Sequence, residues 1–156
     1  MVEIVATGDD IGPEEFSSVE NSLGLRLPED FRAFLLAHNG GRPEPGDIDL
    51  SDGSDTVPVN IIYGIGGEYH RNIAMVFEVF KDRIPEGFCP IAADGMGSQF
   101  LIGVATPFEG QVFYWDREGE ADDSLGETPT MGNMHLVAPS FPEFLSNLYE
   151  FVDDED

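Results

Sequence analysis

The residue types that most often perform catalysis or bind metals are few in this sequence, and their spacing matches no reactive motif. His38, His70, His135 and Cys89 are its only histidines and its only cysteine, and none forms an HExxH, CxxC or HxH pair. No G-x-S-x-G segment presents a nucleophilic serine, and Cys89 lies in a predicted strand, where cysteine is typically buried and unreactive. The sequence therefore predicts no metal site, no cofactor and no nucleophilic catalysis.

Carboxylates are the one reactive group that is abundant. The 156 residues include 31 acids against 7 Lys and Arg, which gives a formal net charge of −24. So many acids always offer some pair, and a carboxylate-based hydrolase stays open as an alternative although no motif favours it. The charge argues against binding nucleic acid or an anionic membrane, because phosphates are held by clustered Lys and Arg. It favours a basic protein partner or, with equal weight, a need for solubility or a salty cytoplasm.

Two loop types that often bind ions are present only in outline. Gly64-Ile65-Gly66-Gly67 lies between a predicted strand and a predicted helix, as phosphate-binding loops do, but it lacks their spacing and has the acid Glu68 beside it. The acidic loops 47–55 and 118–127 do not place their carboxylates at the spacing of an EF-hand. We therefore expect a tight turn at 64–67 and no calcium site in either acidic loop.

The length is that of one domain, which we place over residues 1–156, with a core over about 11–152 and an acidic tail at 153–156. A single cysteine cannot form an intramolecular disulfide. The first residues lack the basic start of a signal peptide, and no apolar stretch approaches the roughly 20 residues that span a bilayer. We expect a cytoplasmic protein, monomeric or a weak homodimer.

Apolar residues at helical spacing predict four helices, at residues 13–23, 28–39, 72–80 and 140–152. Pro13 suits the first turn of a helix, and Gly24 suits its end. His38 falls on the buried stripe of the second helix. Ser140-Phe141-Pro142-Glu143 matches a capping box and opens the last helix, whose broad apolar face reaches Val152.

Alternating or continuous apolar runs predict strands at 59–63, 88–93, 99–104 and 111–116, with 134–138 as a further strand or an extended lead-in to the last helix. The turns 94–97 and 106–110 are short, so the strands that they join must pair antiparallel. Residues 41–58 and 117–133 are predicted to be irregular, apart from a short edge strand around Ile48 and Leu50.

Aromatic residues fall on both faces of this predicted meander. Because side chains alternate along a strand, Val112 and Tyr114 point one way while Phe113 and Trp115 point the other. Such a sheet is either enclosed between helices or uses one face to bind a partner. Trp115 is equally compatible with a core position and with an exposed contact.

Several motifs together resemble a known family, the SUKH superfamily, which includes fungal cell-wall synthesis regulators and many bacterial immunity proteins. The resemblance covers about residues 11–151. Its motifs are Leu23-Gly24-Leu25-Arg26-Leu27-Pro28-Glu29-Asp30-Phe31, Asn39-Gly40-Gly41, Asp94-Gly95-Met96-Gly97, Gly110-Gln111-Val112 with Trp115-Asp116, and Ser140-Phe141-Pro142-Glu143-Phe144-Leu145.

The resemblance implies an α+β fold, with a central, mostly antiparallel sheet flanked by N-terminal and C-terminal helices. It also implies binding without catalysis: in bacterial members, neutralisation of a toxin that is often a nuclease, and in fungal members, regulation as a protein-interaction scaffold. A charge of −24 could cover the basic surface of a nuclease. The residues expected to contact the partner are Tyr63, Asp94, Gly95, Gly97, Phe100, Trp115, Asp116 and Glu118.

Overall fold

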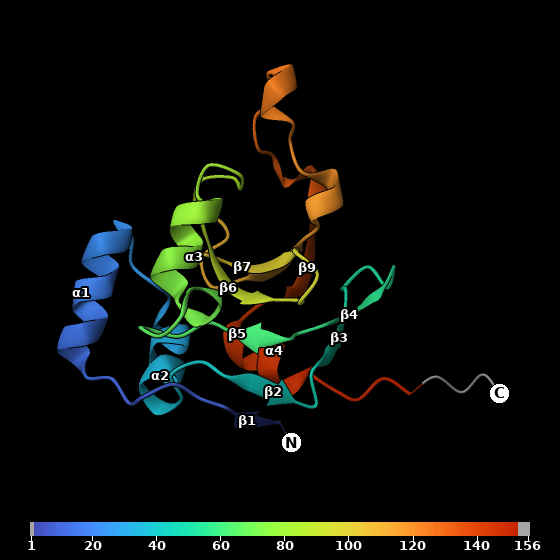
Figure 1. Cartoon of the computed structure of the whole chain (residues 1–156). Coiled ribbons are helices and arrows are strands. Elements are labelled where there is room, and N and C mark those ends of the chain that lie inside the picture. Colours follow the sequence, from blue (N-terminus) through green and yellow to red (C-terminus); the bar gives the residue numbers. More distant parts are fainter. Residues whose placement is uncertain (1, 153–156) are drawn as a thin grey trace.

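The centre of the protein is a five-stranded antiparallel sheet in which every strand pairs with the next one along the chain (Figure 1). A computed structural model describes residues 2–152. The strands, in spatial order, are β5 (Ile61–Ile62), β6 (Phe88–Ala93), β7 (Gln99–Gly103), β8 (Val112–Trp115) and β9 (Met134–Ala138). The predicted meander and the α+β fold class are confirmed, and residues 134–138 form a strand.

Within the described part of the chain, four α-helices surround the sheet: α1 (Pro13–Leu23), α2 (Glu29–Ala37), α3 (Ile73–Phe80) and α4 (Phe141–Ser146). Gly24 ends α1 in the left-handed conformation, with a φ of 70°. The Asn72 side chain accepts hydrogen bonds from the first backbone N–H groups of α3. His38, expected on a buried stripe, instead ends α2 with extended backbone and an exposed side chain, so that expectation is wrong.

The last helix is shorter than its apolar pattern predicts. Ser140 caps α4 through a hydrogen bond from Glu143 N at 3.3 Å, as expected, but the helix ends at Ser146. Beyond it, the backbone of Tyr149 exchanges two hydrogen bonds of 2.9 Å with Asp47 in an antiparallel bridge. This pairing extends the chain and leaves Phe151 55% exposed, outside the core. The predicted tail 153–156 lies outside the described residues.

Two small antiparallel sheets form at the edge of the domain. β1 (Glu3–Val5), which the sequence analysis missed, pairs with β2 (Arg42–Glu44), and β3 (Asp47–Asp49) pairs with β4 (Thr56–Pro58) in a hairpin. Residues 41–58 are therefore more regular than expected, although the predicted edge strand near Ile48 is present. The strand predicted over 59–63 shrinks to the two residues of β5: Val59 N bonds to Gly46 O and not to the sheet, whereas Asn60 N and Tyr63 N bond to β6 on either side of β5.

Helices cover both faces of the sheet with aromatic contacts. On one face, Phe80 of α3 packs against Trp115 with ring centroids 5.7 Å apart. On the other face, Phe144 of α4 packs against Phe100 at 5.5 Å, and Phe141 joins α4 to α2. The sequence left open whether this sheet is enclosed or binds a partner with one face, and the structure shows an enclosed sheet.

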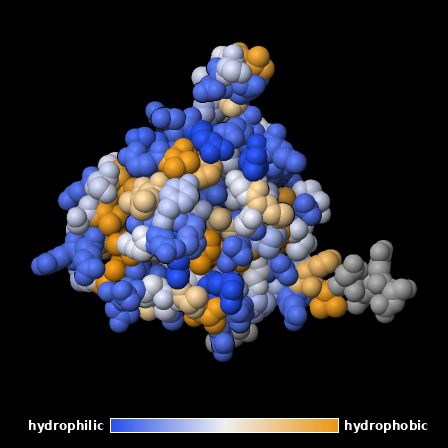
Figure 2. All heavy atoms as spheres, in the orientation of Figure 1, coloured by the Kyte–Doolittle hydropathy of each residue, from blue (hydrophilic) through white to orange (hydrophobic). Residues whose placement is uncertain are grey.

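Residues 117–133, which we call the acidic arm, connect β8 to β9 and project from the body of the protein (Figure 1). The arm contains three short 3-10 turns, η2 (Arg117–Gly119), η3 (Asp123–Leu125) and η4 (Met131–Asn133). Figure 2 shows hydrophobic atoms at its end, where Leu125 is 73% exposed. Within residues 2–152, no helix is long and apolar enough to cross a membrane.

Candidate functional site

Three of the residues expected to contact a partner lie in the core. Phe100, Trp115 and Tyr63 are 0%, 1% and 3% exposed, because α3 and α4 cover the two faces of the sheet. The Tyr63 hydroxyl donates a hydrogen bond to Gln99 inside the protein, and burial raises the pKa of Tyr63. The structure therefore places these aromatic side chains in the core and not on the exposed surface that a partner contact requires, although Tyr63 also lines a groove beside α3.

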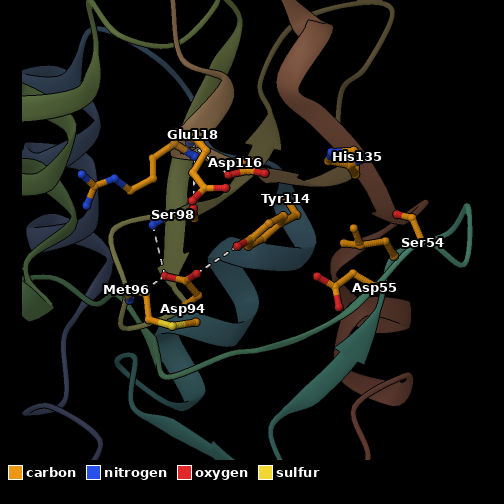
Figure 3. A pocket seen from close by; sticks show the side chains of 11 residues that line it. Ser54, Asp55, Asp94, Met96, Ser98, Tyr114, Asp116, Glu118 and His135 are labelled. Atoms are coloured by element: carbon orange, nitrogen blue, oxygen red, sulfur yellow. Dashed lines mark hydrogen bonds between the residues drawn. The ribbon is translucent and has the colours of Figure 1, made fainter.

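Asp94 organises the turn between β6 and β7. Its Oδ1 accepts hydrogen bonds from Met96 N at 2.7 Å and Ser98 N at 3.1 Å, while its Oδ2 accepts one from the Tyr114 hydroxyl at 2.9 Å (Figure 3). Asp94 is only 5% exposed. Burial, with the hydrogen bond to Asp94, raises the pKa of Tyr114 to about 12. Asp94 therefore acts mainly by positioning the turn, and contributes its charge from beneath the surface.

A cleft of about 570 Å³ opens beside this turn, between the β3–β4 hairpin and the base of the acidic arm. Figure 3 shows side chains from all these segments facing one hollow. Its lining residues are Leu50, Ser54, Asp55, Asp94, Met96, Ser98, Tyr114, Asp116, Arg117, Glu118 and His135. The structure thus brings together Asp94, Asp116 and Glu118 from the predicted set.

The acidic loops 47–55 and 116–127, distant in the sequence, meet at this cleft. Asp55 comes from the first loop, while Asp116 and Glu118 come from the second. The Asp116 carboxylate accepts a hydrogen bond from Glu118 N at 3.0 Å, which fixes the start of the acidic arm. Several carboxylates around one hollow create a negative potential that attracts cationic side chains. Arg117 and His135 also line the hollow, but carboxylates predominate among its charged residues, and we call it the acidic cleft.

Gly95 and Gly97 do not line the acidic cleft. Both have positive φ angles, of 86° and 102°, which let the turn reverse within a few residues. The Arg117 side chain lies across Gly97, where an added Cβ would meet its guanidinium at 2.5 Å. These two glycines lie on the opposite side of the turn from the acidic cleft, so the predicted contact residues do not form one continuous site.

Sequence reasoning missed several polar residues of the acidic cleft, among them Tyr114 and His135. Tyr114 reaches Asp94 because its strand pairs with β7, where it lies opposite Phe100. His135 lies opposite Tyr114 on β9 and has its Nδ1 3.5 Å from Asp52 of the β3–β4 hairpin. No local motif could have indicated that Tyr114 and His135 line the cleft, since the position of each depends on strand pairing.

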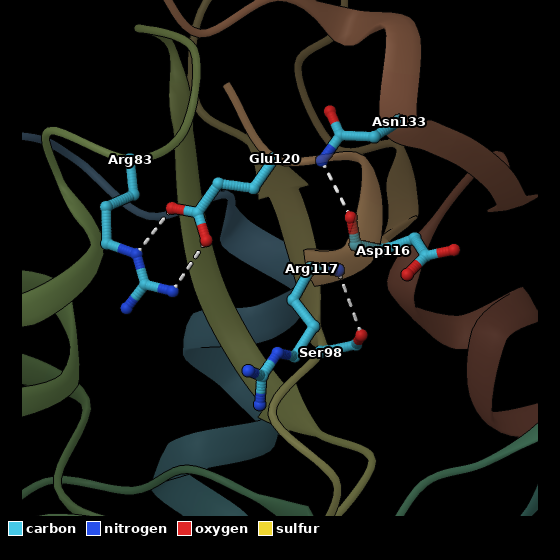
Figure 4. Close-up of polar contacts among 6 residues, drawn as sticks. All are labelled: Arg83, Ser98, Asp116, Arg117, Glu120 and Asn133. Carbon is cyan, nitrogen blue, oxygen red and sulfur yellow. Dashed lines mark hydrogen bonds and ion pairs between the residues drawn. The ribbon is translucent and has the colours of Figure 1, made fainter. Parts of the chain in front are cut away.

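The base of the acidic arm is fixed to the body by polar contacts (Figure 4). Arg83 holds Glu120 through two hydrogen bonds of 2.7 and 2.9 Å, and its guanidinium lies over the Phe80 ring at 4.4 Å. Asn133 donates to the Asp116 carbonyl at 2.8 Å, which ties the two ends of the arm together. A bidentate Arg–carboxylate pair is among the stronger ion pairs, so the acids at the base keep a fixed position beside the cleft.

The antiparallel meander between two helical layers, with acidic loops converging at one cleft, defines an α+β domain with no cluster of metal-ligating side chains among residues 2–152. The chain belongs to the SMI1/KNR4 family (SUKH-1), whose family model matches residues 10–147. The predicted membership in the SUKH superfamily is confirmed.

Two proteins of Bacillus subtilis (strain 168) are similar to this chain. The SPbeta prophage-derived uncharacterized protein YokK is 23% identical over 154 residues, which cover 88% of this chain and 74% of that protein. Uncharacterized protein YnaB shares a shorter segment, 47% identical over 32 residues, which covers 20% of this chain and 22% of that protein.

Proposed function

We propose that this protein is a cytoplasmic immunity protein, which neutralises a cognate toxin by binding it and performs no catalysis. The observation that carries the proposal is the convergence of two acidic loops at one cleft, in a member of the SUKH-1 family with a net charge of −24. The partner would be a basic toxin domain, for which a nuclease is the leading candidate, because a nuclease needs a cationic surface to hold nucleic acid.

The mechanism would be occlusion. Asp55, Asp116 and Glu118 would take the place of phosphates on the basic surface of the toxin, while the acidic arm covers the region beside it. Long-range attraction should make association fast and strongly dependent on salt, since exposed charges are screened over about 10 Å at 0.1 M salt. No bond is made or broken in this mechanism.

The decisive experiment is co-expression with the toxin domain encoded by the neighbouring gene. Wild-type protein should restore growth, and purified protein should form a complex with the toxin domain at low salt. Equal cell death with and without this protein, together with no complex at low salt, would refute the immunity proposal for that pair. Capture of endogenous proteins without protection would instead favour a regulatory scaffold.

A matched pair of variants tests the acidic cleft within that experiment. Asp116→Asn with Glu118→Gln removes two charges at the cleft, and the new amide oxygen at 116 can still accept the bond from residue 118. Glu86→Gln with Glu109→Gln removes two charges from exposed positions elsewhere. The first pair should slow association with the toxin at least about tenfold at low salt, and the second should slow it much less. Equal effects would show that net charge alone acts.

A further inference from the structure

A second hollow lies on the opposite face of the sheet from the acidic cleft and has the reverse chemical character. It is a groove of about 440 Å³ between α3, β5 and the β6–β7 turn. Its floor includes the apolar side chains of Ile61, Val76 and Phe80, and Tyr69 stands at its edge with 45% of its surface exposed. We call it the arginine groove, because Arg42 and Arg71 also line it.

The charges around the arginine groove differ from those of the whole chain. One residue in five of this sequence is acidic, yet none of the described residues that line the groove is Asp or Glu. Two of the seven basic residues line it, and a third, Arg117, which lines the acidic cleft, reaches across Gly97 at the border of the groove. On so acidic a protein, a surface that contains arginines and no acids is suited to bind a carboxylate.

The guanidinium groups keep hydrogen-bonding capacity for such a ligand. Arg71 donates to the Ala6 carbonyl, which orients it, and a guanidinium has five N–H donors. Arg42 is paired with Glu44 at 3.2 Å, but both side chains are more than half exposed, and such surface pairs contribute little. Exchange of this weak contact for a partner's carboxylate is therefore easy.

The β6–β7 turn lies between the two hollows and contributes residues to both. Asp94, Met96 and Ser98 line the acidic cleft, whereas Gly95, Gly97 and Gln99 line the arginine groove. Met96 stands between them with 66% of its surface exposed. A single partner that grips this turn would meet negative charge on one side and positive charge on the other.

We propose that the arginine groove binds a protein partner through a segment that carries a large apolar side chain next to a carboxylate. The apolar side chain would lie against Ile61 and Tyr69, above the buried Val76 and Phe80, and the carboxylate would accept hydrogen bonds from Arg42 and Arg71. The inference goes beyond the proposed immunity role, because it assigns an acidic contact to a protein whose surface otherwise attracts bases. Opposite charges on the two sides of one turn would also fix the orientation of the partner.

The test uses two small probes that differ only in charge, N-acetyl-L-phenylalanine and N-acetyl-L-phenylalaninamide, titrated into the full-length 15N-labelled protein. The carboxylate probe should give saturable shifts of the amide resonances of Tyr69, Gly95 and Gly97. The neutral amide should bind about tenfold more weakly, because it loses the charge-assisted bonds. Equal affinity of the two probes, no saturable shift, or shifts confined to the acidic cleft would overturn the proposal.

Variants locate the binding and give the control. Arg42→Gln and Arg71→Gln should each weaken the carboxylate probe several-fold, on the order of 1 kcal/mol or about fivefold. Arg26→Gln, at an exposed arginine outside the groove, should leave its affinity unchanged. The Arg42→Gln variant gives an independent result if the loss of the Arg71 side chain disturbs the segment at Ala6, to which Arg71 is hydrogen-bonded. Concentration-dependent shifts at the groove without any probe would identify a second copy of this chain as occupant and refute a heterologous partner.

No toxin is needed for this titration, so its outcome is separate from that of the co-expression experiment. If neither probe binds the arginine groove but the protein fully protects cells from the toxin, only the proposal for the arginine groove is refuted. Probe binding without protection would refute only the immunity role.

Discussion

Replacement of Asp94 by alanine should destabilise the protein far more than replacement by asparagine. The alanine variant leaves Met96 N, Ser98 N and the Tyr114 hydroxyl without their acceptor. At about 1 kcal/mol for each lost hydrogen bond, the free energy of unfolding should fall by about 3 kcal/mol. Asparagine keeps Oδ1 and with it the two backbone bonds, so Asp94→Asn should cost about 1 kcal/mol or less, helped by the removal of one charge from an overcharged chain.

Urea denaturation followed by the fluorescence of Trp115, the single tryptophan, measures both variants. A double-mutant cycle with Tyr114→Phe isolates the bond between the two side chains, with an expected coupling of about 1 kcal/mol. An alanine variant within 1 kcal/mol of wild type, or an asparagine variant as unstable as the alanine one, would show that Asp94 does not hold the turn. A coupling near zero would show that the hydrogen bond between Tyr114 and Asp94 does not stabilise the protein.

Three further predictions concern other parts of the molecule. Spectrophotometric titration should show one tyrosine that ionises near pH 12, and this transition should be missing in the Tyr114→Phe variant. Because folding raises the pKa of Tyr114, the contribution of this residue to stability is present below pH 10 and is lost as the pH rises towards 12. Phe144→Ala should lower the free energy of unfolding by about 3 to 5 kcal/mol in urea, whereas Phe151→Ala at its exposed position should change it by less than about 0.5 kcal/mol; similar losses would contradict the observed end of α4. Hydrogen bonds from Thr56 and Tyr149 lower the pKa of Asp49. Wild type should therefore be more stable than Asp49→Ala at neutral pH, and this difference in stability should disappear as the pH falls below about 3.8. A difference that stays constant between pH 7 and pH 3 would refute this.

Local sequence patterns predicted most of the secondary structure because they depend only on residues that are close together in the chain. The apolar spacing of 13–23 and the left-handed stop at Gly24 required no knowledge of the rest of the chain. The end of the last helix was not predictable in this way. Phe151 continues the helical spacing, but the backbone of Tyr149 pairs with Asp47 from a distant part of the chain, and that pairing determines the local conformation.

The candidate site was predicted in part for the same reason. Asp116 and Glu118 stand at the end of a predicted strand, in a loop rich in acids, and the structure places both in the acidic cleft. His135 reaches the cleft only because β9 pairs with β8, which no local pattern announces. The aromatic residues were ambiguous, since alternation along a strand shows that Tyr114 and Trp115 lie on different faces of the sheet but not that helices cover both faces.

The position of the acidic arm in the chain has a consequence for how this protein can vary. Trp115 and Met134 pair directly across β8 and β9, and Asp116 N bonds to Asn133 O, so the arm leaves and rejoins the sheet at adjacent points. A loop closed in this manner can change length at small entropic cost, because that cost grows only with the logarithm of the number of residues. Changes in length or sequence between residues 121 and 130 would thus alter the outline and charge presented to a partner, while the contacts at the base of the arm and the register of the five strands stay the same.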